Sequence, residues 1–212
     1  MMKIFAIVML TAVFAAPADA QQRSANTIGV RGFATFGNII FQAQDSFDAI
    51  FDRHAGPIIG GGGQVLLPSG VFLEVAASQF RQEGERAFVT AAGEVFRLGI
   101  PVEVTITPLE ITGGWRYRKW PRIVPYGGVG YSMYRYRETS EFAGADENVD
   151  DRFGGFHVMG GAEYRLLRWL AVGGEVVFAS VPDALGDGGV SAAFNEDNLG
   201  GTTIRLKISV GR

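Results

Sequence analysis

The last twelve residues, "GTTIRLKISVGR" (201–212), alternate strictly between apolar and polar side chains. The apolar positions are Ile204, Leu206, Ile208 and Val210, and the polar positions between them are Arg205, Lys207 and Ser209. Successive side chains of a β-strand point to opposite faces, so this stretch predicts a strand with one apolar and one charged face. Such a strand belongs either to the surface of a soluble sheet or to a barrel wall with lipid outside and packed polar groups inside.

The first twenty residues, "MMKIFAIVMLTAVFAAPADA", have the pattern of a secretory signal peptide. Lys3 precedes an apolar run over 4–16, and Ala18-Asp19-Ala20 matches a small-residue cleavage site. We therefore expect residues 1–20 to be removed and residues 21–212 to form one domain. A membrane-anchor helix is disfavoured because the run is shorter than the ~20 residues that a helical span needs. No later stretch reaches that length, so a membrane-spanning structure would have to be a barrel.

Seven more segments alternate in the same way as the last one. They are residues 27–36, 57–68, 71–80, 102–118, 125–138, 156–166 and 170–180. The long spacers are 37–56, 82–101, 139–152 and 181–199, and the short ones surround Pro68–Gly70, Lys119–Val124 and Leu167–Arg168. Four long connections at one end and three short ones at the other predict an all-β, eight-stranded antiparallel up-and-down transmembrane barrel. A soluble sandwich gives no reason for this asymmetry.

Two segments carry additional features. In 102–118, Val102 and Ile106 share one face, but beyond Pro108 the apolar residues occupy the other parity, which predicts a β-bulge near the proline. The spacer stretch "QDSFDAIFDRHAG" (44–56) predicts a short amphipathic helix with Asp45 or Ser46 as its N-cap and Gly56 as its stop. This helix would lie either on the membrane interface or on the rim of its own barrel.

Aromatic residues gather beside the short turns, which is typical of the interfacial girdle of a membrane barrel. The predicted girdle residues are Trp115, Tyr117, Trp120, Tyr126, Tyr164 and Trp169. Ordinary core packing is the alternative, but it does not favour one end of a barrel.

Taken together, these segments resemble the small eight-stranded outer-membrane β-barrel family of Gram-negative-type bacteria, with a layout similar to the OmpA transmembrane domain, OmpX and OmpW. The resemblance is one of pattern over residues 25–212, without a short diagnostic motif. It implies a monomer in the bacterial outer membrane, surrounded by outer-membrane lipids and inserted by the barrel insertion machinery. Such barrels usually end in an aromatic residue, whereas this chain ends Val210-Gly211-Arg212.

If the apolar face meets lipid, the opposite face lines the barrel interior. The candidate interior residues are Arg31, Glu74, Glu110, Arg116, His157, Glu163, Arg165, Glu175, Arg205 and Lys207, with Glu103 and Arg118 on the same predicted face. An eight-stranded barrel is just wide enough for side chains to fill it, and a buried charge without a partner is costly. We therefore expect a network of ion pairs that fills the interior, and the alternative is a polar substrate path.

The sequence indicates a function class but names no extracellular partner. The net charge of −3 argues against nucleic-acid binding, and the absence of cysteine removes thiolate chemistry. His54 and His157 are the only histidines, the glycine runs precede no phosphate-binding motif, and the acidic spacers match no calcium loop. We therefore expect no enzyme, no cofactor and no metal. A structural or surface-interaction barrel with long extracellular loops is favoured, followed by a narrow channel for small or hydrophobic molecules and then by a soluble periplasmic ligand-binding barrel.

Overall fold

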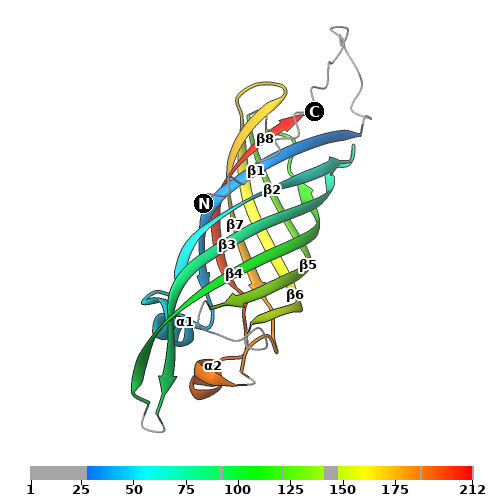
Figure 1. The fold of residues 1–212 in the computed structure, drawn as a ribbon. Coiled ribbons are helices and arrows are strands. Elements are labelled where there is room, and N and C mark those ends of the chain that lie inside the picture. Colours follow the sequence, from blue (N-terminus) through cyan, green and yellow to red (C-terminus); the bar gives the residue numbers. More distant parts are fainter. Residues whose placement is uncertain (1–27, 91–92, 121, 141–147, 187, 212) are drawn as a thin grey trace.

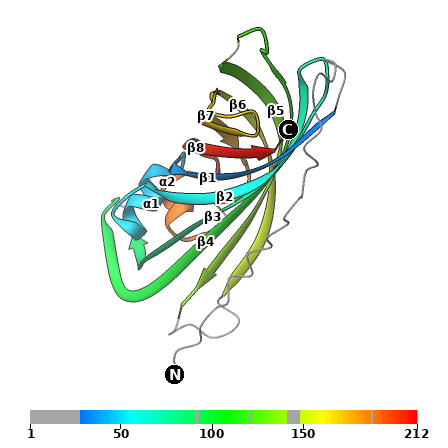
Figure 2. The same cartoon turned by 90° about the horizontal axis from the view of Figure 1, so that it is seen from above.

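The chain folds into one closed antiparallel β-barrel, which confirms the predicted fold class (Figures 1 and 2). The computed structural model describes residues 28–90, 93–120, 122–140, 148–186 and 188–211, so the predicted signal peptide lies outside the described residues. The strands are β1 (Gly29–Phe41), β2 (Ala55–Leu66), β3 (Val71–Val89), β4 (Val95–Arg116), β5 (Ile123–Thr139), β6 (Val149–Arg165), β7 (Leu170–Ser180) and β8 (Gly201–Gly211). Each strand pairs with the next in sequence, and β8 pairs with β1 to close the barrel.

Alternation along each strand separates an apolar outer face from the barrel interior. In β8, Leu206 is 65% exposed on the outside, whereas the neighbouring Lys207 is 1% exposed inside. Large apolar side chains on the outer surface occur on all eight strands, for example Val30, Leu73, Val129 and Phe156. A contiguous apolar exterior of this extent marks an interaction with another molecule or a membrane.

Strand β4 is continuous through Pro108, so the predicted bulge is wrong. The pairing of β3 with β4 keeps one register on both sides of the proline, with Phe80 opposite Ile106 and Ala77 opposite Leu109. Val104, Ile106 and Glu110 therefore all point inward and are buried. The predicted interior position of Glu103 is wrong for the same reason, because its carboxylate pairs with the exposed Arg81 on the outer face. The inward-facing residues of β4 change from apolar to charged beyond Pro108. In the sequence, this change has the same pattern as a shift of register.

The predicted spacer 82–101 is mostly β-structure. Strands β3 and β4 continue as a hairpin beyond the barrel wall at the long-loop end (Figure 1). A register irregularity between Glu85 and Ala87 interrupts the pairing in this extension. Alternation is weaker here because neither face is covered as completely as in the barrel, so the sequence resembles a loop.

Two short helices, α1 (Gln44–Phe51) and α2 (Gly189–Phe194), lie at the long-loop end of the barrel (Figure 1). Neither of them is long and apolar enough to cross a membrane. Helix α1 packs on the barrel rim, the second of the two predicted placements, because Phe47 stacks on Phe41 of β1 with ring centroids 4.0 Å apart. A side chain at Gly84 would clash with the Ile50 carbonyl, so this glycine permits the close approach of α1 to β3.

The N-cap of α1 is supplied from elsewhere in the chain, which corrects the prediction of Asp45 or Ser46 as the cap. The helix begins after Ala43, which makes no side-chain cap, and it ends at Asp52 rather than at Gly56. The carboxylate of Glu196, which follows α2, accepts hydrogen bonds from the backbone N–H of Asp45 at 3.1 Å and of Ser46 at 2.8 Å. An acceptor at this position satisfies the free N–H groups of the first helical turn.

Candidate functional site: the barrel interior and its two mouths

The long-loop half of the interior is filled by apolar side chains. Four phenylalanines form what we term the aromatic plug, namely Phe41, Phe47, Phe51 and Phe80. Beneath the plug, Val104 and Ile106 of β4 and Tyr134 of β5 are almost completely buried. Helix α1 therefore closes this half of the barrel with side chains that continue the apolar packing of the wall.

Helix α1 is also held at the mouth by a salt bridge outside the barrel wall. The guanidinium of Arg97 in β4 binds both carboxylate oxygens of Asp52, with one N–O distance of 2.7 Å. This hydrogen bonding, together with the nearby positive charge, lowers the pKa of Asp52 below its ordinary value of 3.8. The salt bridge therefore attaches the C-terminal end of α1 to β4, and the Glu196 cap attaches its N-terminal end to the segment between α2 and β8.

The short-turn half of the interior holds a continuous network of charged side chains, which we term the charged layer. Its members are Arg31, Glu74, Glu110, Arg116, Glu163, Glu175, Arg205 and Lys207. Lys207 lies 2.6 Å from Glu74 and 3.2 Å from Glu175. Arg205 contacts Glu175 and lies 3.0 Å from Glu110.

The network continues to the short-turn mouth through a neutral side chain. Gln64 donates to Glu74 at 2.8 Å and accepts from Arg116 at 3.0 Å. Arg116 in turn pairs with Glu163, which also binds Arg31 at 3.0 Å. Every one of these ion pairs joins two different strands, and only Arg205 with Glu175 and Lys207 with Glu175 join neighbours in the wall. The charged layer therefore ties opposite sides of the barrel together.

Tyr126 belongs to this network, which corrects its assignment to the interfacial girdle. Its side chain is 6% exposed, its hydroxyl donates to Glu175 at 2.8 Å, and its ring packs against Phe72. Tyr126 follows Pro125 near the start of β5, where its inward parity outweighs its closeness to the short turn. With Tyr126 and Gln64 included, all eight strands contribute a side chain to the network.

The other five predicted girdle residues lie on the outside near the short turns. They are Trp115, Tyr117, Trp120, Tyr164 and Trp169. The rings of Trp115, Tyr117 and Trp120 form an edge-to-face series with centroid distances of 5.9 and 5.3 Å. Aromatic rings at this level suit a boundary between an apolar and an aqueous phase.

His157 is buried between two hydroxyl groups. Its Nε2 lies 2.8 Å from Thr112 Oγ1, and its Nδ1 lies 2.7 Å from Ser132 Oγ. Gly130 leaves room for the ring, since a side chain there would meet His157 within 3 Å. Both nitrogens are occupied and the ring is 3% exposed, so this histidine holds three strands together and has no free nitrogen for proton transfer to an outside molecule.

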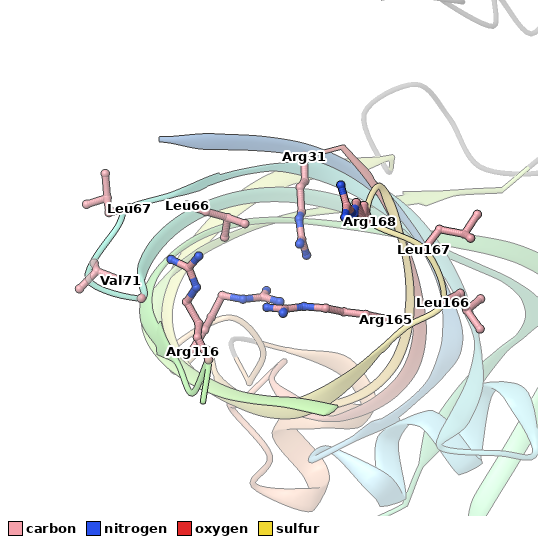
Figure 3. A pocket seen from close by; sticks show the side chains of 11 residues that line it. Arg31, Leu66, Leu67, Val71, Arg116, Arg165, Leu166, Leu167 and Arg168 are labelled. Carbon is pink, nitrogen blue, oxygen red and sulfur yellow. The ribbon is translucent and has the colours of Figure 1, made fainter. Parts of the chain in front are cut away.

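Arg165 is a predicted interior residue that is not part of the charged layer. Its side chain makes no hydrogen bond or ion pair with the described residues, and its Nε is buried without a partner. It lines a cavity of about 640 Å³ at the short-turn mouth, together with Arg31, Arg116, Arg118 and Arg168 (Figure 3). Sequence reasoning placed Arg31, Arg116, Arg118 and Arg165 inside but missed Arg168, which lies in a turn without alternation.

Within the described residues, no group of three or more acidic or histidine side chains is arranged to hold a metal ion. In this barrel, ion pairs inside connect strands on different sides of the wall. Apolar side chains close the long-loop mouth, and a cluster of arginines lines the short-turn mouth.

A family model and several solved structures match this chain. A family model described as the outer membrane protein beta-barrel domain matches residues 5–210. The N-terminal β-barrel domain of Pseudomonas aeruginosa OprF is 10% identical, with a TM-score of 0.47 over 86% of this chain and 97% of that one. A major outer membrane protein from Thermus thermophilus is 11% identical, with a TM-score of 0.48 over 86% and 99%. Ail, the attachment invasion locus protein of Yersinia pestis, is 8% identical, with a TM-score of 0.46 over 87% and 99%. A comparison with curated proteins gave no match.

Proposed function

Because this chain belongs to the outer membrane protein β-barrel domain family, we propose that it is an integral outer-membrane protein whose interior is filled by its own side chains. Its role is structural or surface-binding and non-catalytic, with the long connections outside the cell and the short turns in the periplasm. It acts as a monomer, inserted by the barrel insertion machinery after removal of residues 1–20.

The outer surface supports the membrane location. Outward-facing residues such as Leu73, Ile111 and Leu206 are at least half exposed, although each is apolar. In water such a surface would drive aggregation, whereas in a bilayer it is matched by acyl chains. The outer-face aromatic residues near the short turns fit one membrane interface. A soluble periplasmic barrel would expose the same apolar surface to water, which disfavours that alternative.

The charged layer is the observation that supports a closed interior most directly. Glu163, Glu175, Arg205 and Lys207 are each at most 4% exposed, and each has an ion-pair partner on another strand. A water-filled channel would leave such groups hydrated, whereas a packed interior needs them paired. The aromatic plug supports the same conclusion from the other half, because α1 covers the long-loop mouth with apolar contacts.

The decisive experiment measures current through the purified protein in planar lipid bilayers, with an open porin as the positive control. The closed interior predicts no stable single-channel steps. Reproducible steps that change in size or ion selectivity in Glu163→Gln would reject the closed interior and favour the narrow channel. Membrane fractionation with heat-modifiable gel mobility tests the location separately, and recovery in the soluble periplasmic fraction would reject the membrane assignment.

The long-loop end is the part of the molecule best suited to meet an external partner. It carries the β3–β4 hairpin extension, both helices and a cavity of about 300 Å³ between α1, α2 and the hairpin. An epitope tag inserted at Gly188 should be reached by protease on intact cells, while a tag at Ser69 in the turn between β2 and β3 should be protected. The reverse result would invert the topology.

A further inference from the structure

The short-turn mouth concentrates positive charge around one open cavity. Five arginines line it, namely Arg31, Arg116, Arg118, Arg165 and Arg168. Figure 3 shows the side chains of Arg31 and Arg165 directed into the barrel opening. None of the described residues that line the cavity is acidic. The arginines come from β1, from β4 and the residues that follow it, from the end of β6 and from the turn between β6 and β7, so the closure of the barrel brings them together.

The carboxylates of the charged layer do not balance these charges. Glu163 is the nearest one, and Arg31 and Arg116 already share it. Arg118 donates to the Pro68 carbonyl at 3.2 Å, and its guanidinium forms no ion pair within the described part of the chain. Arg165 and Arg168 have no ion pair among the described residues.

Two donor groups at this mouth have no acceptor among the described residues. The Nε atoms of Arg31 and Arg165 are both buried without a hydrogen-bond partner. A buried donor without a hydrogen bond costs free energy of folding, and repulsion between like charges held near one another adds to that cost. An anion in the cavity would relieve both.

We propose that this cavity binds a phosphate group. Guanidinium groups present paired N–H donors that match phosphate oxygens, and several of them around one ligand suit a tetrahedral, multiply charged anion better than a single carboxylate. The cavity is large enough for a phosphate or diphosphate, whose oxygens would accept from Arg165 and the partly paired Arg31.

The phosphate group has two possible sources, a free phosphate or diphosphate and the headgroup of a membrane phospholipid. The rim carries apolar side chains beside the arginines, since Leu166 and Leu167 are about half exposed and point away from the barrel in Figure 3. This pairing of leucine and arginine would also suit a phospholipid. The two sources share one chemistry at the arginines and are separated by the experiment.

The test uses the full barrel folded into phosphatidylcholine nanodiscs. In one arm, pyrophosphate is titrated by calorimetry, and in the other, phosphatidylglycerol is incorporated and its retention is measured by native mass spectrometry. We expect saturable binding in at least one arm, weakened at least tenfold in Arg168→Gln and in Arg165→Gln. Arg97→Gln at the opposite mouth is the matched control and should bind as the unmodified protein does.

The outcomes divide cleanly. Saturable pyrophosphate binding alone identifies a free phosphate ligand, and selective retention of phosphatidylglycerol alone identifies a lipid headgroup. If Arg165→Gln does not fold, judged by heat-modifiable mobility, the rim variant Arg168→Gln decides. Equal binding by Arg168→Gln and the unmodified protein, or no saturable binding in either arm, would overturn the proposal.

Discussion

The two halves of the barrel interior are enclosed by the same strands, but apolar side chains fill one half and charged side chains fill the other. Near the long-loop mouth, inward side chains are apolar, as with Val104 and Ile106 of β4, and they merge with the aromatic plug. A few residues further along the same strand, Glu110 enters the charged layer. Apolar packing needs complementary volumes, whereas buried charges need specific partners at defined distances. The two halves should therefore differ in how they respond to substitution, even where the change in volume is small.

The largest effect is expected in the charged layer, from Glu175→Gln. This change keeps the size of the side chain but removes the negative charge that Arg205 and Lys207 both contact. Arg205 keeps Glu110 and Lys207 keeps Glu74, but the interior gains an excess positive charge. Breaking these buried pairs should lower the free energy of unfolding by about 3–5 kcal/mol, measured by guanidinium chloride denaturation in detergent micelles. The control is Glu103→Gln on the outer face, where the pair with Arg81 is worth at most about 1 kcal/mol. Similar losses in both variants would show that the charged layer is hydrated.

The apolar half should respond to lost volume instead. Ile106 is fully buried between the wall and the plug. Ile106→Ala should lower the free energy of unfolding by about 2–5 kcal/mol, and Ile106→Val by about 0.5–1.5 kcal/mol, in proportion to the cavity created. The same denaturation assay measures both. A nearly neutral Ile106→Ala would mean that this half is loosely packed and that the contrast between the halves does not hold.

A smaller and local effect is expected where the plug is held in place. Glu196→Ala removes the acceptor that caps the first turn of α1, at a cost of about 0.5–2 kcal/mol. Hydrogen exchange of the α1 amides should accelerate, while amides of the barrel wall should not change. Asp197→Ala is the control, because the Asp197 carboxylate makes no hydrogen bond or ion pair with the described residues. Equal exchange in the two variants would contradict a capping role for Glu196.

The smallest effect is a pH dependence at the other end of α1. The pKa of Asp52 is lowered by Arg97 from its ordinary value of 3.8, so the salt bridge stabilises the docked helix above that pH. This contribution is lost as the pH falls through the lower folded pKa. Carboxyl titration by NMR should place Asp52 below 3.8, and Arg97→Met should return it towards that value. A pKa of Asp52 that does not respond to Arg97→Met would remove the salt bridge as a tether.

Strict alternation made most of the wall predictable. In β7 and β8 the predicted and observed strands agree closely, because each residue there meets either the packed interior or the outer surface. Where that contrast fades, prediction failed. The sequence around Glu85 predicts a loop where the structure has the hairpin extension, and the change of polarity near Pro108 predicts a bulge where β4 is continuous. A pattern of polarity cannot distinguish a shifted register from an interior that changes its own polarity.

The sequence by itself determined the barrel class, the number of strands, the order of long and short connections, and which charges face inward in most strands. These properties are local, since they depend on the period of two and on turn chemistry. Only the tertiary structure decided which side chains contact one another. Lys207 pairs with Glu74, and Glu196 caps α1. Tyr126 points inward and donates to Glu175, and Arg168 lines the cavity at the short-turn mouth. These contacts connect residues that are far apart in the chain, and closure of the barrel brings them within reach of one another.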